Sequence, residues 1–475
     1  MMALSRRGFL AGAGTALLAA RAPGLALARD ARATAGGVID LVAGPSRAPI
    51  GAADALPSNL WTYNASAPGP EIRVTRGARV RVRLTNRLEE PTSVHWHGLR
   101  LANAMDGVAG LTQAPIAPGE TFAYDFVAPD AGTYWYHAHN KSWNQVARGL
   151  YGALIVEEEV PAFPPERDLT LMLDDWVVGD DGRLDLASLG SLMDWSHAGR
   201  LGNRVTVNGR VDPLLTVPAD MPCRLRLINA SNARIFALDP NRFDARVLAY
   251  DGQALPEPVR LAYAPLLLGP AQRVDLLVVP EAGTQIPLED VSGAAPLPLA
   301  RIRAGEPPDA PAERAGEVPV VRPNPLPEPD LASARTVRLR MTGGAMRPIG
   351  PVTYRGEEMR GGDFRRTRQA WAFNGVANMP ETPLFAARRG ETIVLETVNE
   401  TAFIHAMHVH GHHFRILQRS GSDIDEGRPW RDTFLIGPDQ TTRIAFVADN
   451  PGKWLYHCHM LEHAAAGMTT WFDVS

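Results

Sequence analysis

The chain of 475 residues carries 48 lysine and arginine and 52 aspartate and glutamate side chains, and 45% of its residues are hydrophobic. This length exceeds one ordinary domain, the nearly balanced charge argues against a nucleic-acid partner, and no apolar run reaches the about 18 residues of a membrane-spanning helix. The 43 glycines and 40 prolines, with few helix-period segments, favour many short strands joined by turns.

The first 28 residues have the pattern of an export signal. Arg6 and Arg7 precede the apolar stretch 11–20, and the small residues Ala26 and Ala28 are typical of a cleavage site. Adjacent arginines indicate the twin-arginine route, which exports folded proteins. We therefore expect cleavage after Ala28, a contact with the twin-arginine export machinery and a periplasmic location; a disordered basic tail is the alternative.

An alternating pattern of apolar and polar residues that ends in asparagine occurs three times. The copies are 77–86, 221–229 and 390–399. Such alternation predicts a half-buried strand. In the first and third copies, histidines follow the asparagine by nine and eleven residues, whereas the middle copy has Leu238 and Pro240 there.

A longer repeat supports the same division. Residues 117–139 match residues 437–459 at a constant offset of 320, and Ala138 falls where Cys458 stands. The middle copy keeps only the strand 272–280. Three related all-β domains of the sandwich or barrel type are therefore predicted. The expected boundaries are a signal at 1–28, domains at 38–160 and 161–300, a Pro-rich linker at 301–334 and a third domain at 335–475.

Ten of the 13 histidines fall into four short groups, two within residues 95–139 and two within residues 405–463. Two histidines separated by one residue on a strand point to the same face, because side chains alternate with period two. The first and third domains could thus build an eight-histidine cluster at their interface, although imidazoles alone do not identify the metal. The pairs are His95 and His97, His137 and His139, His408 and His410, and His457 and His459.

A second set of ligands identifies the metal as copper. His405, Cys458, His463 and Met468 supply two imidazoles, a thiolate and a thioether, which is the donor set of a blue-copper electron-transfer site. A structural zinc site would not normally use a thioether. The neighbours of Cys458 would point into the histidine cluster, so that the peptide links two metal centres. A disulfide with Cys223 is conceivable, but Cys223 is better interpreted as a small buried hydrophobic residue.

These motifs, their order and the threefold β repeat resemble the multicopper oxidases, the family of laccases and bacterial periplasmic copper oxidases. The resemblance covers essentially the whole mature chain and implies three consecutive cupredoxin-like Greek-key domains. It also implies four copper ions, with O2 and small reducing substrates as partners. By this resemblance, the type 1 copper is held by His405, Cys458, His463 and Met468, the type 2 copper by His95 and His408, and the type 3 pair by His97, His137, His139, His410, His457 and His459.

Two carboxylates are candidates for catalytic roles. Glu462 lies between His459 and His463, where an acid could relay protons for O2 reduction. Asp106 follows the first histidine pair and could orient a water or a histidine at the type 2 copper. Their alternative interpretations are a surface carboxylate and a turn residue, since Asp-Gly is a strong turn signal.

Three histidines have no place in this ligand set. His412 and His413 follow the third histidine group and are interpreted as structural or exposed. His197 is isolated and is expected to be a surface or hydrogen-bonded loop residue.

The combined features predict a laccase-like enzyme that oxidises phenols, aromatic amines or metal ions and reduces O2 to water. We expect His405 or His463 to present its edge at the surface, where electrons are taken up. A cuprous oxidase in copper tolerance is the alternative enzyme, although the scattered methionines argue against it. A non-enzymatic copper-binding scaffold is the remaining alternative. A monomer suffices, because one chain holds both halves of the cluster.

Overall fold

The computed structural model describes residues 31–32, 37–52, 55–262, 265–305, 318–360, 362–421 and 428–475. The predicted export signal lies outside the described residues, and so does the 306–317 part of the predicted linker. Within the described ranges, no helix is long and apolar enough to cross a membrane.

The first third of the chain forms two sheets that share one hydrophobic core. One sheet has the order β1 (Ala31–Arg32), β4 (Ile72–Thr75), β9 (Tyr151–Glu157), β8 (Gly132–Ala138) and β6 (Val94–His97). The other has the order β3 (Ser58–Tyr63), β2 (Ile39–Ala48), β5 (Arg79–Asn86) and β7 (Thr121–Val127).

The middle third has its own core beneath a six-stranded sheet. That sheet has the order β11 (Arg204–Val207), β10 (Asp168–Trp176), β13 (Cys223–Asn229), β18 (Arg273–Val278), β15 (Arg246–Tyr250) and β16 (Gln253–Val259). The smaller sheets are β12 (Leu214–Val217), β20 (Leu297–Ala304) and β19 (Gln285–Asp290), and the pair β14 (Phe236–Leu238) and β17 (Leu266–Leu268).

The last third repeats the arrangement around a third core. One sheet has the order β24 (Trp371–Phe373), β21 (Arg335–Gly343), β26 (Glu391–Asn399), β31 (Thr441–Ala448), β28 (Phe414–Arg419) and β29 (Trp430–Arg431). The other has the order β25 (Ala386–Ala387), β33 (Thr469–Val474), β32 (Gly452–Cys458), β27 (His405–Val409) and β30 (Thr433–Ile436), and β22 (Val352–Tyr354) pairs with β23 (Glu357–Met359).

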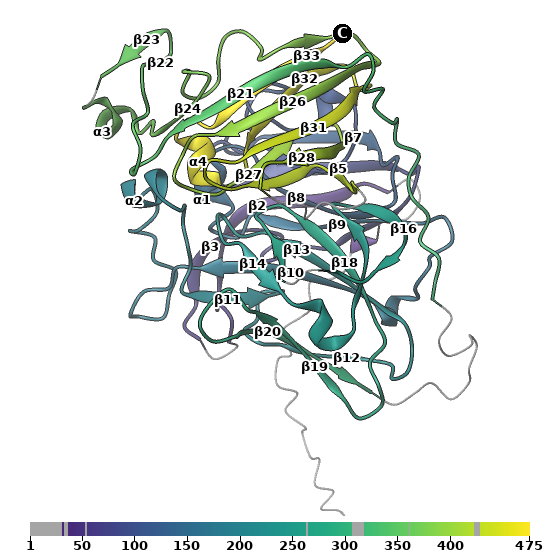
Figure 1. Ribbon diagram of the computed structural model, residues 1–475. Helices are drawn as coiled ribbons and strands as arrows, with labels where there is room; N and C mark the ends of the chain where they lie inside the picture. Colours follow the sequence, from purple (N-terminus) through teal and green to yellow (C-terminus); the bar gives the residue numbers. More distant parts are fainter. Residues whose placement is uncertain are drawn as a thin grey trace, which may run out of the picture.

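Helices are short and lie between strands. Helices α1, α2 and α4 lie on the same side of the molecule (Figure 1), where α4 contacts both of the others. The α-helices are α1 (Ser142–Gln145), α2 (Leu192–Ser196), α3 (Asp363–Thr367) and α4 (Leu461–Ala465); the 3-10 turns are η1 (Asn103–Met105), η2 (Pro165–Arg167) and η3 (Pro240–Phe243).

The three predicted strand copies occupy the same place in the three thirds of the chain. Strands β5, β13 and β26 each pair in parallel with an earlier strand of the same third, which is β2, β10 or β21. Each also pairs antiparallel with β7, β18 or β31. The prediction of three related all-β units is confirmed, while the boundaries drawn from the sequence stay predictions.

The asparagine that ends each copy closes the following loop. Asn86, Asn229 and Asn399 are fully buried. In each case the side-chain amide donates to two or more backbone carbonyls, and its oxygen accepts from the N–H two residues later. A buried amide with all its partners fixes the loop geometry, which explains why the pattern ends in this residue type.

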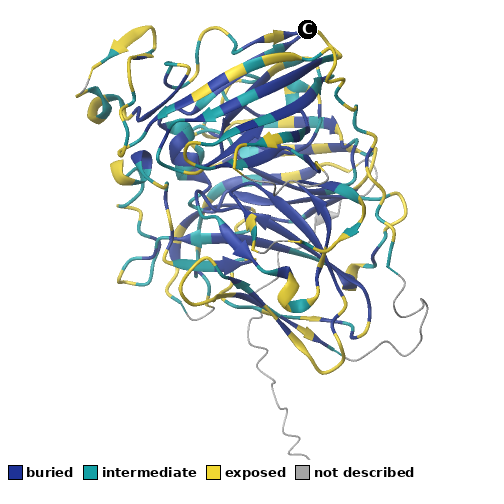
Figure 2. Cartoon of the chain, in the orientation of Figure 1, coloured by how far each residue is buried: buried dark blue, intermediate teal, exposed yellow. Residues whose placement is uncertain are grey.

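The strand of the middle copy, β13, is more buried than the half-buried strand that its alternation predicts. Strand β13 is buried on both faces, whereas β5 alternates between buried and exposed residues (Figure 2). The polar face of β13 carries Arg224 and Arg226, and both guanidinium groups bind the buried Asp168. Arg226 also donates to Thr133 of β8. This face is therefore covered by the first domain, with its charges paired as burial requires.

Candidate metal centres

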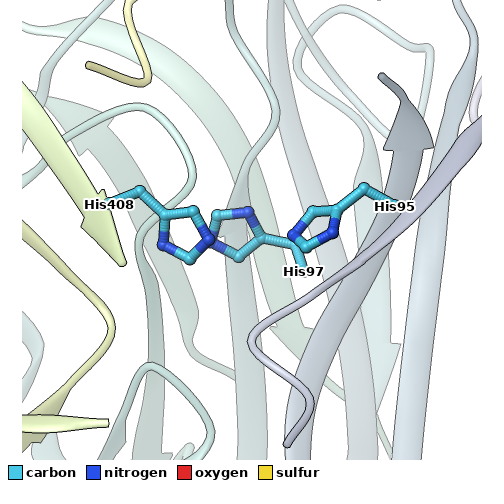
Figure 3. A group of neighbouring side chains, drawn as sticks. All are labelled: His95, His97 and His408. Carbon is cyan, nitrogen blue, oxygen red and sulfur yellow. The ribbon is translucent and has the colours of Figure 1, made fainter. Parts of the chain in front are cut away.

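Strand pairing brings the histidine pairs together. On β6 and β8, His95 lies opposite His137, and on β27 and β32, His408 lies opposite His457. Figure 3 shows the rings of His95 and His97, from the first domain, meeting His408 from the third. The stacked rings of His97 and His408 have centroids 3.8 Å apart.

The eight predicted histidines form one cluster between the first and third domains. Seven of them are buried and His139 is half-buried. Within the cluster, sets of three side chains place their ligand atoms within 4.8 Å of one another. The sets are His97, His137 and His459; His139, His410 and His457; and His95, His97 and His408.

Hydrogen bonds show which ring nitrogens hold free lone pairs. His457 Nδ1 lies 2.9 Å from the carbonyl oxygen of Cys458, and His410 Nδ1 lies 2.9 Å from Asp106 Oδ2. Because these oxygens only accept, both Nδ1 atoms donate, and both Nε2 atoms keep a lone pair. The two Nε2 atoms nevertheless face each other at 3.1 Å. Two lone pairs at this separation repel unless a cation lies beside them, so the arrangement fits a metal ion.

Further nitrogens in the cluster lack any partner. Among the described residues, His95 Nε2, His97 Nδ1, His408 Nε2 and His459 Nδ1 are buried without a hydrogen bond. Orphaned buried polar atoms are rare in native proteins and call for an unseen partner. Four such atoms in one cluster match the ligand sets described above.

Burial favours the neutral form of most of the cluster imidazoles. Desolvation lowers the pKa of His97, His137, His408, His410 and His459 well below the usual range, and neighbouring histidines lower it further. The pKa of His457 falls to about 4, mainly through burial. Neutral imidazole is the form that binds a metal ion.

Asp106 contacts two histidines of the cluster, as the sequence suggested for one. Its backbone oxygen accepts from His95 Nδ1 at 2.8 Å, and its Oδ2 accepts from His410 Nδ1 at 2.9 Å. The second carboxylate oxygen, Oδ1, lies 3.2 Å from His95 Nδ1 but forms no hydrogen bond within the described chain. Asp106 thus fixes the tautomers of two rings.

A second residue that positions cluster histidines, Asp432, was not predicted from the sequence. The backbone oxygen of Asp432 accepts from His408 Nδ1 at 2.9 Å, and its carboxylate lies 3.4 Å from His97 Nε2. Arg273 holds this carboxylate with two hydrogen bonds of 2.9 and 2.6 Å. All of these residues are fully buried. Because Arg273 begins β18, the middle domain supports the cluster without supplying a ligand.

The second ligand group surrounds Cys458. Its Sγ lies 3.7 Å from His405 Nδ1 and 3.9 Å from His463 Nδ1, and the two nitrogens are 3.0 Å apart. His463 Nε2 donates to a backbone carbonyl and His405 Nε2 donates to Thr401 Oγ1, whose own proton goes to Asn399 Oδ1. Both Nδ1 lone pairs therefore face the thiol. Burial raises the pKa of Cys458 to about 12, so only a bound cation would favour the thiolate.

Met468 and Trp371 complete the surroundings of this group. Met468 is fully buried in the core of the third domain, and its backbone pairs with Cys458 N and His463 O. The indole of Trp371 lies against both imidazoles, with ring centroids 5.1 Å from His405 and 4.6 Å from His463. The pocket is thus dry and apolar, as the potential of a copper site requires.

The prediction of an exposed histidine edge is wrong. His405 and His463 are both 0% exposed. The residue that ends α2 lies against His463, because His463 Nε2 donates to the backbone oxygen of His197 at 2.7 Å, whereas His405 Nε2 is bonded to Thr401 Oγ1. His197 was expected to be an isolated loop residue, and its hydrogen bonding within the loop agrees with that expectation. Its contact with His463 was not foreseen.

Glu462 is buried, and its hydrogen-bond partners belong to the middle domain. Its carboxylate accepts from Asn232 Nδ2 at 2.6 Å and from the backbone N–H of Arg200 at 3.4 Å. Burial raises its pKa to about 7. In the described part of the chain, no hydrogen bond or ion pair joins it to a cluster histidine. A proton from this carboxyl would need bridging water to reach the cluster.

The remaining predictions concern residues outside the ligand set. His412 and His413 are buried structural residues: His412 packs against Phe446 and Trp454, and His413 contacts Gln253. The two cysteines are free and separately buried, so the disulfide does not form.

An eight-histidine cluster beside a group of two histidines and a cysteine defines a copper-dependent oxidoreductase. Models of the multicopper oxidase family match residues 47–160 and 356–475. The chain is 31% identical to multicopper oxidase MmcO of Mycobacterium tuberculosis, over 99% of this chain and 96% of that protein. A solved multi-copper oxidase from Pseudomonas thermotolerans matches with a TM-score of 0.77 and 32% identity, covering 92% of this chain and 100% of that chain. For Lac15 from a marine microbial metagenome the values are 0.71 and 35%, with the same coverage.

The chain therefore belongs to the multicopper oxidase family. It is a laccase-like, copper-dependent enzyme that couples the one-electron oxidation of reducing substrates to the reduction of O2. The prediction of a cupredoxin-like all-β fold is confirmed.

Proposed function

We propose that the chain binds four copper ions in the two groups described above. One observation carries this proposal: Cys458 belongs to the smaller group, and its chain neighbours His457 and His459 belong to the eight-histidine cluster. The type 1 ligands are His405, Cys458, His463 and Met468. The type 2 ligands are His95 and His408, and the type 3 ligands are His97, His137 and His459 for one ion and His139, His410 and His457 for the other.

The bound copper would supply a one-electron acceptor at the smaller group and an O2-reducing centre in the cluster. The chain contributes the connection, since the peptide from His457 to His459 joins both groups through covalent bonds. It also contributes preorganised ligands: Asp106 and Asp432 hold His95, His408 and His410 by their Nδ1 atoms. Fixed rings lose little entropy when the metal binds.

Glu462 is the proposed proton relay for O2 reduction. Its burial and its place three residues after His459 support the role, and the hydrogen bond from Asn232 holds the carboxylate in place. Glu462→Gln is expected to slow O2 reduction roughly tenfold. Reduction of the type 1 copper should be unchanged, and equal slowing of both half-reactions would contradict the relay.

The laccase-like assignment is tested by copper content, visible absorption and oxygen uptake of the loaded protein. Four copper ions per chain, an intense blue thiolate band and faster uptake with a phenol than with Cu(I) are expected. Loaded protein without turnover would indicate a scaffold instead.

A cuprous oxidase is the second candidate, and one observation favours it. Met193 and Met346 are 61% and 69% exposed near the loop that covers His463, and thioethers suit Cu(I). Faster oxygen uptake with Cu(I) than with a phenol would support this candidate.

Export to the periplasm by the twin-arginine route is part of the proposal. It rests on Arg6, Arg7 and the following apolar stretch. A monomeric state is proposed because one chain supplies all the ligands. Fractionation of cells that express an Arg6→Lys, Arg7→Lys variant tests the route, and sedimentation of the mature protein tests the monomer.

A further inference from the structure

The route by which electrons reach Cys458 is closed at the usual point, the imidazole edge. His405 Nε2 is bonded to Thr401, and His463 Nε2 is bonded to the carbonyl oxygen of His197. With both rings fully buried, a reductant cannot touch either ligand. Electrons must therefore pass through the residues that are hydrogen-bonded to the two rings.

The cover is a fixed part of the structure. Helix α2 is capped by Ser191, whose Oγ accepts from Met193 N. Its end is held from the third domain, because Ala345 N donates to Ser196 O at 2.8 Å and Trp371 Nε1 donates to Trp195 O at 2.7 Å. The carbonyl of His197 is therefore held in place over His463.

The side chain of His197 has one ring nitrogen fixed and one available. Nδ1 lies 3.2 Å from the carbonyl oxygen of Met193, which can only accept, so Nδ1 is the ring nitrogen that donates. Nε2 then holds a lone pair, and among the described residues nothing donates to it. An acceptor without a partner on a half-buried ring suits a ligand that donates a hydrogen bond.

The surroundings of this acceptor are apolar and aromatic. The His197 ring lies against Phe403, with centroids 5.9 Å apart, and Phe403 lies against Trp371. Leu192, Ile404 and the two methionines nearby are exposed. Of the charged residues around the cover, Asp194 pairs with Arg200 and Arg347 with Asp439, while Arg368 lies over the Trp195 ring and donates to the carbonyl oxygen of Gly190. This surface therefore favours an uncharged aromatic ring.

We propose that a phenolic reductant docks on this cover, with its hydroxyl donating to His197 Nε2 and its ring against Phe403. The backbone carbonyl of His197, hydrogen-bonded to His463, then connects the docked ring to the ligand group. The phenol loses one electron, which leaves through His463 to the acceptor bound there, and its hydroxyl proton passes to solvent water. A phenoxyl radical is released. This inference rests on the proposed type 1 ligand set.

Binding can be measured apart from turnover. Copper-loaded, fully reduced enzyme under anaerobic conditions is titrated by calorimetry with 2,6-dimethoxyphenol and with its methyl ether, which lacks the hydroxyl donor. The phenol should bind about 5- to 10-fold more tightly, the value of one net hydrogen bond. His197→Phe should abolish this preference, Phe403→Leu should weaken both ligands, and Val160→Ala, at an exposed site between β9 and η2, should change neither.

Kinetics distinguish docking from a structural effect. For His197→Phe, anaerobic bleaching of the blue band should need about 5- to 10-fold more phenol for the half-maximal rate. The limiting rate and the type 1 potential should stay unchanged, since the backbone bond to His463 remains. Equal affinity for phenol and ether in the wild type, or unchanged affinities in both variants, would overturn the proposal. Bleaching by Cu(I) but not by the phenol would also overturn it. A wild-type protein without a blue band would overturn the type 1 assignment together with the docking proposal.

Discussion

The middle domain and the two outer domains share their strand order but differ in chemistry. Strands β5, β13 and β26 have the same partners, and their terminal asparagines close the same loop. At the positions where the outer domains carry histidine pairs, the middle domain carries Leu238 and Pro240, both buried. The fold therefore does not depend on the ligands, and a few residues decide which copy carries chemistry.

The middle domain nevertheless contributes to the sites, because its residues contact site residues of the third domain. Arg273 holds Asp432 behind the cluster, Asn232 holds Glu462, and the backbone of His197 binds His463. The proposed ligands all come from the outer domains, and the middle domain adds contacts that support them. Substitution of a proposed ligand should change the colour and turnover first, whereas substitution of a supporting residue should change stability first.

The largest effect is expected from removing the ligand that only the third copy has. Cys458→Ser should abolish the blue band and lower turnover by roughly a thousandfold or more, about 4 kcal/mol in barrier. The fold should persist, because Ala138 occupies the equivalent buried position of the first copy. Absorption and oxygen uptake are the measurements. Cys223→Ser, in the middle domain, is the control and should keep both; native turnover in Cys458→Ser would contradict the assignment.

Removing the middle domain's support should act on stability first. Arg273→Met leaves the buried carboxylates of Asp432 and Asp251 without their cation, which should cost about 3–5 kcal/mol of unfolding free energy. Chemical denaturation measures this loss. The matched control is Arg79→Met, since Arg79 pairs with Asp125 at an exposed site and should cost less than about 1 kcal/mol. Equal costs would refute a supporting role for Arg273.

The asparagine repeat allows a direct comparison of copies. Asn229→Ala and Asn399→Ala should each cost about 2–3 kcal/mol, because several buried hydrogen bonds are lost. Only Asn399→Ala should also shift the blue band, since Asn399 orients Thr401 and through it His405. Melting curves and absorption spectra of both variants test this. A shift of the same size in Asn229→Ala would remove the distinction.

A smaller effect is expected at the cluster itself. Asp106→Asn replaces the carboxylate oxygen that accepts from His410 by an amide that accepts through one atom only. Copper affinity in the cluster or the rate of O2 reduction should fall by about 10- to 100-fold. The blue band should be kept. Its loss with full cluster copper would show that Asp106 acts elsewhere.

The fold class and the clustering of the histidines could be predicted, because both depend on short local patterns in the sequence. Alternation indicates a strand, and two histidines separated by one residue on a strand share a face. The common orientation of His95 and His97 could therefore be predicted from that segment alone. The constant offset between the two longer repeats then placed the pairs in equivalent domains.

The supports and the cover could not be predicted, because they join distant parts of the chain. Asp432 meets Arg273 from 159 residues away, and His463 meets His197 from 266 residues away. No spacing in the sequence signals such contacts. Strand β13 also appears half-polar in sequence, and only packing against the first domain buries Arg224 and Arg226.

The most direct test of the division between ligand-bearing and supporting domains is anomalous diffraction at the copper edge from crystals of the loaded protein. This division between the domains predicts four copper positions per chain. One lies among His405, Cys458 and His463, three lie among the eight histidines, and none is bound by the middle domain. A copper ion held by middle-domain residues, or none beside Cys458, would contradict it.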